Sequence, residues 1–263
     1  MITAIYAPKG AALEYAPLAL NLYGDADGKV GGCSHRCDYC YCPGILHISR
    51  DRFFCSPRPK LNIIERMEQD CRALRGDNEN RRVLLQFIGD PYCVEELEFG
   101  VTRAALQIME CFAIPAEVLT KGGTRACRDF DILQRAGGRF GTSLIWSSEV
   151  YREIHEPGAA PIADRIEAMA EAHRLGIPTW MSLEPVQCTN EGLGAVRKTL
   201  LYVDEYRLGV ERNAPYYYDD YWPDFLASAL DMLRDAGKKW LVKESLQKYL
   251  RGRPATGGPK EQR

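Results

Sequence analysis

Short apolar runs alternate with longer amphipathic segments along most of the chain, and this alternation limits the possible folds more than any other feature. Short strands that alternate with helices of about 10–15 residues form βαβ units, in which the strands run parallel. The predicted strands are 83–88, 116–120, 139–146, 179–183, 206–209 and 239–242. The predicted helices are 61–75, 95–112, 129–135, 161–175, 195–204 and 222–235.

Six such units are fewer than the eight of a closed barrel, so we predict an α/β fold with a partial, open (β/α)6 barrel of the TIM type. Residues 1–250 are predicted to form a single domain, with an N-terminal extension and a C-terminal helix. Residues 251–263 are rich in Gly, Pro and charge and are predicted to be a disordered tail. In such folds the functional residues lie where strands end, which here points to Gly89, Asp90, Lys121, Ser143 and Glu184.

Composition sets further limits. A formal net charge of −2 and 46% hydrophobic residues fit a protein with a full core and no general attraction to nucleic acid or membranes. No long uncharged apolar run predicts a membrane span, and the first residues do not resemble a signal peptide, so we expect a cytoplasmic location and no membrane partner. Ten cysteines in a chain of this length, without a secretory signal, favour metal binding over a disulfide framework.

Cys33, Cys37 and Cys40 fall within eight residues, in the run Gly-Cys-Ser-His-Arg-Cys-Asp-Tyr-Cys-Tyr-Cys-Pro. Three thiolates at these spacings suffice for three irons of a [4Fe-4S] cubane and leave the fourth iron without a protein ligand. An open position of this kind is what a catalytic metal centre needs. Two alternatives remain: a structural zinc site completed by Cys42 or His35, and a redox or structural role without a cluster. The second distant ligand pair that is typical of structural zinc is missing.

The CxxxCxxC spacing, with Tyr39 just before the last cysteine, resembles the signature of the radical S-adenosylmethionine (SAM) superfamily. The resemblance implies that residues 1–250 form a radical SAM domain, with a [4Fe-4S] cluster and S-adenosylmethionine as cofactors. In that superfamily the amine and carboxylate of the cofactor chelate the fourth iron. An electron from the cluster cleaves the sulfonium to a 5′-deoxyadenosyl radical, which abstracts hydrogen. A reductant such as flavodoxin or ferredoxin is implied as a partner.

A narrower resemblance, over about residues 17–188, is to spore photoproduct lyase and the SplB-like DNA repair photolyases. It implies lyase-type chemistry, with nucleic acid as a candidate substrate. The motifs that carry it are the cysteine loop with His35, Tyr39 and Tyr41; Gly89-Asp90-Pro91-Tyr92 with Glu95 and Glu96; Leu119-Thr120-Lys121; and Glu156-Pro157-Gly158 with Pro161 and 165–168.

Individual roles follow from this resemblance. Lys121 would contact the carboxylate of the cofactor, and Gly89 with Asp90 would receive its amine, because opposite charges attract. Tyr41 would lie beside the adenosyl group and is a candidate for cofactor binding and for catalysis. The remaining cofactor-binding candidates are Ser143, and Glu184 as a contact to cofactor or substrate.

One position departs from the photoproduct lyases. They carry a cysteine three residues before the strand-end aspartate, and that cysteine returns a hydrogen to the product radical. Here the position is Phe87, which has no transferable hydrogen. Cys93, three residues beyond Asp90, is the catalytic candidate in its place. The departure argues against transferring the repair of thymine dimers to this chain.

Basic and aromatic segments bear on the class of substrate. Two basic segments, the first with interleaved aromatic residues, suit contact with nucleic acid. An aromatic run at 214–222 is a candidate to line or cover the barrel mouth, with packing as a surface cluster as the alternative. Charge runs are also typical of solvated faces, so protein, peptide and small-molecule substrates stay open, as does a non-enzymatic zinc-stabilised binding module. The basic segments are Arg50, Arg52, Arg58 and Lys60 around Phe53 and Phe54, and residues 238–263.

Overall fold

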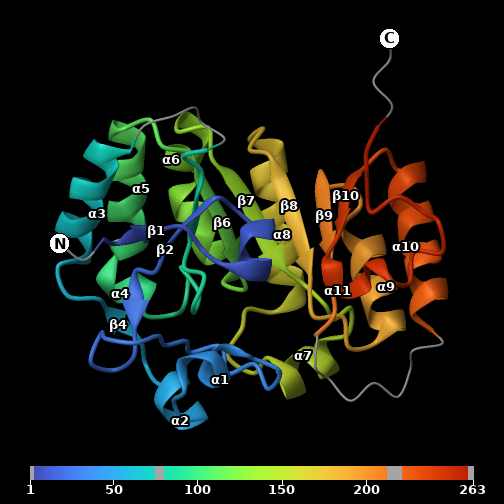
Figure 1. Ribbon diagram of the computed structural model, residues 1–263, viewed down its shortest axis with the longest axis horizontal. Coiled ribbons are helices and arrows are strands. Elements are labelled where there is room, and N and C mark those ends of the chain that lie inside the picture. Colours follow the sequence, from blue (N-terminus) through green and yellow to red (C-terminus); the bar gives the residue numbers. More distant parts are fainter. Residues whose placement is uncertain (1–2, 75–79, 212–220, 260–263) are drawn as a thin grey trace.

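All six predicted strand segments contribute to one sheet, and most of their apolar side chains are buried, as is typical of parallel sheets. The computed structural model describes residues 3–74, 80–211 and 221–259. In these residues the sheet has nine strands in the order β1-β2-β5-β6-β7-β8-β9-β10-β11 (Figure 1). The parallel strands are β2 (Leu18–Leu20), β5 (Val83–Leu85), β6 (Ala116–Thr120), β7 (Arg139–Ser143), β8 (Thr179–Leu183), β9 (Glu205–Leu208) and β10 (Lys239–Val242).

The predicted α/β fold with an open barrel is confirmed. The edge strands β1 (Ile5–Tyr6) and β11 (Thr256–Gly257) pair antiparallel with β2 and β10, and they do not pair with each other, so the sheet stays open. Two predicted strands are too long, since β5 ends at Leu85 and β7 at Ser143. The parallel strand β2 is not predicted, because three residues are too few to show a pattern.

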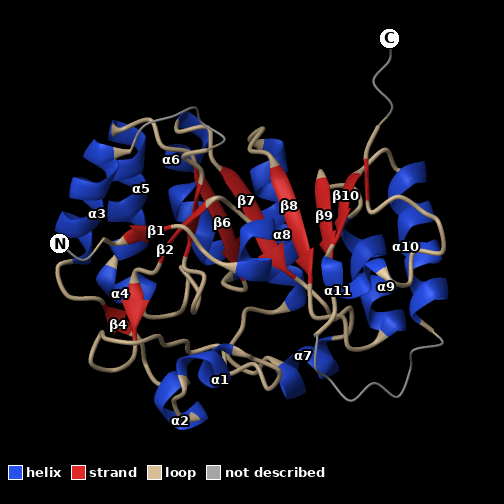
Figure 2. Cartoon of the chain, viewed as in Figure 1, coloured by secondary structure: helices blue, strands red, loops and turns tan. Residues whose placement is uncertain are grey.

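Helices flank the strands (Figure 2). Gly100, with φ of 62°, divides the helix predicted at 95–112 into α4 (Glu96–Phe99) and α5 (Val101–Cys111). The helix predicted at 195–204 is α9, which begins and ends earlier, at Thr189–Thr199. The other helices are α1 (Cys42–Leu46), α2 (Arg50–Phe53), α3 (Ile63–Ala73), α6 (Phe130–Arg135), α7 (Glu149–His155), α8 (Ile162–Arg174), α10 (Trp222–Asp235) and α11 (Glu244–Gln247).

Short elements complete the fold. The 3-10 helices η1 (Gly10–Glu14) and η2 (Gly123–Asp129) precede β2 and α6, and β3 (Tyr23–Gly24) pairs with β4 (Arg58–Pro59). The helices α1, α2 and α7 gather where the arrowhead of β8 points, at the carboxyl ends of the strands (Figure 1). The cysteine loop between β3 and α1 therefore lies at the end of the barrel where such folds place their sites.

The disordered tail predicted at 251–263 is wrong for residues 251–259. Thr256 and Gly257 form β11, which pairs with Leu241 and Trp240 of β10. The Trp240 ring packs so closely on Gly257 that a Cβ there would meet ring atoms at 2.0 Å. The absence of a side chain at Gly257 thus allows the backbone to pack closely on the Trp240 ring. Residues 260–263, like most of the aromatic run 214–222, lie outside the described residues.

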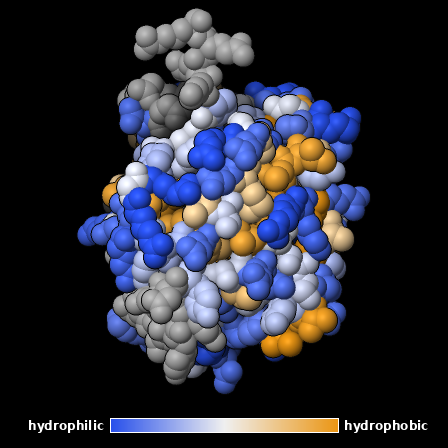
Figure 3. Space-filling model, turned by 90° about the vertical axis from the view of Figure 1, so that its right-hand side faces the viewer, coloured by the Kyte–Doolittle hydropathy of each residue, from blue (hydrophilic) through white to orange (hydrophobic). Residues whose placement is uncertain are grey.

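No helix in the described ranges is long and apolar enough to cross a membrane. On the face shown in Figure 3, hydrophobic side chains form separate patches among hydrophilic ones. The cytoplasmic location stays a prediction.

Charged side chains pack inside the barrel near the start of β6. Glu117 is fully buried, with a carboxylate oxygen 3.1 Å from Nη2 of Arg207 and within 3.7 Å of the guanidinium groups of Arg82 and Arg139. The Arg207 guanidinium also lies 4.3 Å from the centroid of the Trp180 ring. Glu205 of β9 also pairs with Arg139 (2.6 Å) and Arg207 (2.8 Å), so two carboxylates compensate the arginines of β7 and β9 in the interior.

We expect Glu117→Gln to lower the free energy of unfolding by about 3 kcal/mol, because removing the buried carboxylate leaves the charge of the neighbouring guanidinium groups only partly compensated, by Glu205. The control is Glu171→Gln, which breaks the exposed pair with Arg174 (2.6 Å) and should have little effect. Urea unfolding followed by circular dichroism measures both. Equal stabilities for the two variants would contradict the assignment.

Candidate functional site

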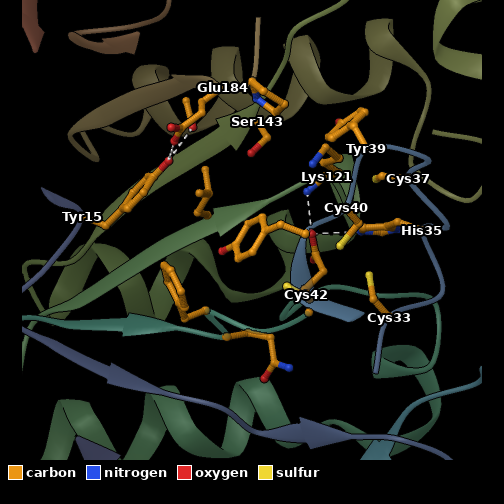
Figure 4. Close-up of a pocket in the computed structure, with 18 of the residues that line it drawn as sticks. Tyr15, Cys33, His35, Cys37, Tyr39, Cys40, Cys42, Lys121, Ser143 and Glu184 are labelled. Atoms are coloured by element: carbon orange, nitrogen blue, oxygen red, sulfur yellow. Dashed lines mark hydrogen bonds and ion pairs between the residues drawn. The ribbon is translucent and has the colours of Figure 1, made fainter. Parts of the chain in front are cut away.

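A cavity of about 570 Å³ opens at the carboxyl ends of the parallel strands. Figure 4 shows cysteine side chains on one side of it and Tyr15 with Glu184 on the other. Every predicted site residue except Cys93 lines this cavity. These are Cys33, Cys37, Cys40, Tyr41, Gly89, Asp90, Lys121, Ser143 and Glu184.

Backbone hydrogen bonds hold the cysteine loop to its surroundings. The N–H of Cys33 donates to the carbonyl of Phe53 at 3.0 Å, and the N–H of Cys40 donates to the carbonyl of Cys37 at 3.2 Å. Farther away in the chain, the carbonyl of His155 at the end of α7 accepts from the N–H of Asp38 at 3.0 Å. The three thiols are therefore presented by a loop that is fixed from both sides.

The thiols differ in their ionisation. Burial raises the pKa of Cys33 well above its usual value and that of Cys37 to about 11. A hydrogen bond from the Cys42 thiol lowers the pKa of Cys40 to about 7, against the effect of burial and with help from the charge of Lys121. Because metals bind thiolates, loading of the site would release protons from Cys33 and Cys37.

The donor set fits an iron–sulfur cluster better than zinc. Among the described residues, no three His, Cys, Asp or Glu side chains converge as the ligands of one metal ion do. The ligands of tetrahedral zinc must converge in this way, whereas each thiolate of a [4Fe-4S] cubane binds a different iron. Cys33, Cys37 and Cys40 line a cavity that has room for a cubane; Cys42 lines it as well, and its thiol forms a hydrogen bond with Cys40.

Asp90 links the cysteine loop to the end of β6. Its Oδ1 accepts hydrogen bonds from the N–H of Tyr92 at 2.8 Å and the hydroxyl of Thr120 at 2.5 Å. Its Oδ2 accepts from the N–H of Lys121 at 2.7 Å and lies 2.9 Å from Nε2 of His35. Burial opposes ionisation, but these partners, His35 first, hold the pKa of Asp90 well below its usual range. Both oxygens are thus occupied by the chain itself; the contact with the cofactor amine stays a prediction.

Two glycines allow the backbone to approach the cysteine loop closely. The N–H of Gly158 donates a hydrogen bond to the carbonyl oxygen of His35 at 2.9 Å, and a Cβ at this position would meet the carbonyl oxygen of Ser34 at 2.1 Å. Gly89 has φ of 113° and packs against the carbonyl oxygen of Gly32. A side chain at either position would displace the loop, which explains both motif glycines without a direct contact to a cofactor.

A buried ion pair lies next to the cysteine loop and is connected to it through Tyr39. Arg165 of α8 and Glu156, which follows α7, are both fully buried, with Nη2 of the arginine 2.6 Å from Oε2 of the glutamate. The Tyr39 hydroxyl donates a hydrogen bond to the other oxygen of Glu156. Arg165 donates to the carbonyl oxygen of Ser143 at 3.1 Å. This network joins the tyrosine beside Cys40 to the end of β7.

Lys121 presents a cation to the cavity. Its ammonium lies 5.5 Å from the centroid of the Tyr39 ring and has no hydrogen-bond or ion-pair partner in the described part of the chain. Burial would lower its pKa, but the nearby Cys37 and Glu156 raise it, so the side chain stays charged. A cation without a partner, beside the cysteines, is suited to binding a carboxylate.

The opposite side of the cavity carries a second polar group. Glu184, directly after β8, accepts hydrogen bonds from the Tyr15 hydroxyl and, at 2.5 Å, from the ammonium of Lys243. Tyr15 also lies 3.2 Å from the hydroxyl of Ser182. Neither Tyr15 nor Lys243 is among the residues predicted from sequence. Lys243 directly follows β10, so its strand-end position was an available signal, whereas Tyr15 follows η1 and has none.

Tyr41 and Phe87 line the cavity, whereas Cys93 does not. Tyr41 is 51% exposed at the mouth of the cavity, and its ring centroid lies 6.5 Å from that of Phe87. Phe87 lines the cavity wall, where it can donate no hydrogen. Cys93 is 1% exposed and belongs to the hydrophobic core, because the turn after Asp90 directs its side chain away from the cavity. The prediction of a catalytic Cys93 is therefore wrong on geometry.

Comparisons with solved structures show related folds. A crystal structure of Streptococcus suis SuiB has a TM-score of 0.61 at 15% identity, covering 87% of this chain and 50% of SuiB. A spore photoproduct lyase mutant with bound AdoMet and dinucleoside spore photoproduct has a TM-score of 0.66 at 12% identity, covering 90% and 78%. Methylornithine synthase (PylB) has a TM-score of 0.56 at 12% identity, covering 85% and 63%.

At these identities the similarity concerns the fold alone, and the chain spans about half the length of SuiB. A search of curated proteins finds no match. A family model described as the Radical SAM superfamily matches residues 29–187, which is more than half of the chain and includes the cysteine loop and the ends of β5 to β8. The protein therefore belongs to the radical SAM superfamily, whose members use a [4Fe-4S] cluster and S-adenosylmethionine.

Proposed function

We propose that this enzyme binds a [4Fe-4S] cluster through Cys33, Cys37 and Cys40 and reductively cleaves S-adenosylmethionine. The observation that carries the proposal is the placement of three thiols and the Lys121 ammonium around one cavity. When bound, the cluster supplies an electron for cleavage of the sulfonium, and the cleaved cofactor supplies the radical for hydrogen abstraction. A flavodoxin or ferredoxin is the proposed source of electrons.

The chain itself would position the cofactor. Lys121 is proposed to bind its carboxylate, and Asp90 accepts a hydrogen bond from the Lys121 N–H and contacts His35 of the cysteine loop. Ser143 presents its side chain to the cavity at the end of β7 (Figure 4). Tyr41 is proposed to lie beside the adenosyl group. Glu184 lies across the cavity from the cysteines, which suits a contact to the substrate or to the far end of the cofactor.

The ligand assignment predicts a sharp difference among four neighbouring cysteines. Replacing Cys33, Cys37 or Cys40 with Ala should abolish the cluster, whereas Cys42→Ala should keep it, because only three thiolates are needed. Iron and sulfide per chain and 5′-deoxyadenosine formation, after anaerobic reconstitution and reduction with dithionite, measure this. Stoichiometric zinc in place of iron, with loss of metal in Cys42→Ala, would contradict the proposal and favour the zinc-stabilised binding module.

For Lys121, we predict that Lys121→Ala weakens S-adenosylmethionine binding at least tenfold while iron content stays at the wild-type level. The loss of a charge-assisted contact of about 1.5–3 kcal/mol is the reason. Equilibrium binding to the reconstituted protein measures it. Lys198→Ala is the control, because the Lys198 ammonium contacts the carbonyl of Ser147 on the surface. Unchanged affinity in Lys121→Ala would remove this residue from the cofactor site.

The finer proposal is lyase-type chemistry on nucleic acid, supported by the motifs shared in order with spore photoproduct lyase. The basic segment at 50–60 adds little support. Phe53 is fully buried and unavailable for stacking on a base, and Arg52 pairs with the buried Asp25 at 2.7 Å. Modification of a peptide is the alternative class, since SuiB, a structural neighbour, has been crystallised with its precursor peptide SuiA.

A nucleic-acid substrate predicts salt-dependent binding. Affinity for a DNA oligonucleotide should fall at least tenfold between about 50 mM and about 200 mM salt, because phosphate contacts release counterions. Transfer of deuterium from labelled DNA into 5′-deoxyadenosine would identify the reacting position. Affinity that does not respond to salt, together with no transfer, would redirect the search to peptides without affecting the radical-generating site.

A further inference from the structure

Arg50, the first residue of α2, contacts two of the proposed cluster ligands from outside the cavity. Its Nη2 donates to the carbonyl oxygen of Cys37 at 2.9 Å, and its Nη1 lies 3.5 Å from the carbonyl oxygen of Cys40. Arg50 does not line the main cavity. It lines a more open recess that adjoins the cavity and shares Cys40 and Tyr41 with it. The guanidinium group therefore bridges the carbonyl oxygens of Cys37 and Cys40 without lining the main cavity.

The turn that carries Arg50 is anchored. Phe53, at the end of the same helix, is fully buried against Cys33, and its carbonyl accepts the hydrogen bond from the Cys33 N–H. The Arg50 Cζ also lies 4.8 Å from the centroid of the Phe54 ring, which limits the freedom of the side chain. The segment 50–54 thus contacts the backbone of all three cysteines.

Two cations flank the loop, and they differ in function. Lys121 faces Cys37 from the cavity side, where the proposed carboxylate of the cofactor would neutralise it. Arg50 instead contacts the carbonyl oxygens of the loop and does not line the main cavity. Reduction adds a negative charge to a cluster, and nearby positive charge and hydrogen bonds to the ligands stabilise that form more than the oxidised one.

We propose that Arg50 is a positioning residue that holds the segment from Cys37 to Cys40 and raises the reduction potential of the cluster. The inference rests on the proposed function, because it needs the cluster to be present. Arg50 would make reduction by a flavodoxin or ferredoxin easier without touching the cofactor or the substrate.

The test compares three variants of the reconstituted full-length protein: Arg50→Gln, Arg50→Lys and, as a control, Arg52→Gln. Arg52 lies in the same helical turn but pairs with Asp25. The midpoint potential is measured by redox titration followed by electron paramagnetic resonance, with iron per chain determined in parallel. We expect Arg50→Gln to shift the potential to a more negative value, Arg50→Lys to shift it less, and Arg52→Gln to match wild type.

A wild-type potential in Arg50→Gln would overturn the inference while leaving the proposed function intact. If Arg50→Gln loses the cluster, the potential of Arg50→Lys tests the inference instead. Lysine keeps the positive charge but lacks the two guanidinium nitrogens that reach both carbonyl oxygens. A more negative potential in Arg50→Lys supports the inference, and a wild-type potential overturns it. Wild-type protein that assembles no cluster would instead overturn the proposed function, and this inference with it.

Discussion

The buried ion pair between Arg165 and Glu156 is the interaction on which the site depends. It joins α8, the end of α7, the end of β7 through Ser143, and the cysteine loop through Tyr39. An ion pair without solvent is costly to form unless its geometry and hydrogen bonds are good, and losing one partner is strongly destabilising. A loop anchored in this way cannot drift relative to the strand ends. Its thiols therefore keep their place beside the residues that those strands present.

A second constraint comes from charge. The thiols bind metal only as thiolates, and burial opposes their ionisation at Cys33 and Cys37. Cations are placed on both sides of the loop, Lys121 within the cavity and Arg50 outside it. In the proposed function the inner cation binds the carboxylate of the cofactor, and the outer one is proposed to act on the metal centre. Burial, which shields radical chemistry from water, and positive charge, which compensates the thiolates, thus act together.

The sequence is informative where the chemistry is local. The spacing of Cys33, Cys37 and Cys40 and the strand-end position of Lys121 could be predicted, because parallel strands bring their carboxyl ends together. Tyr15 could not, since its contact with Glu184 joins residues far apart in the chain and follows no periodicity. The prediction for Cys93 failed because its position in the sequence places it near the carboxyl end of β5 but does not reveal that its side chain enters the core. The prediction of a disordered tail failed at Gly257 for a related reason, since composition alone does not show the Trp240 ring that packs on this glycine.

The central claim is that three cysteines hold a cluster whose fourth iron is open to the cofactor. Electron paramagnetic resonance of the anaerobically reconstituted, reduced protein, recorded before and after addition of S-adenosylmethionine, tests it most directly. Chelation of the open iron changes the environment of the cluster, so the account predicts a [4Fe-4S]⁺ signal whose line shape changes when the cofactor is added. A cluster signal that is identical with and without the cofactor, or no cluster signal at all, would contradict it.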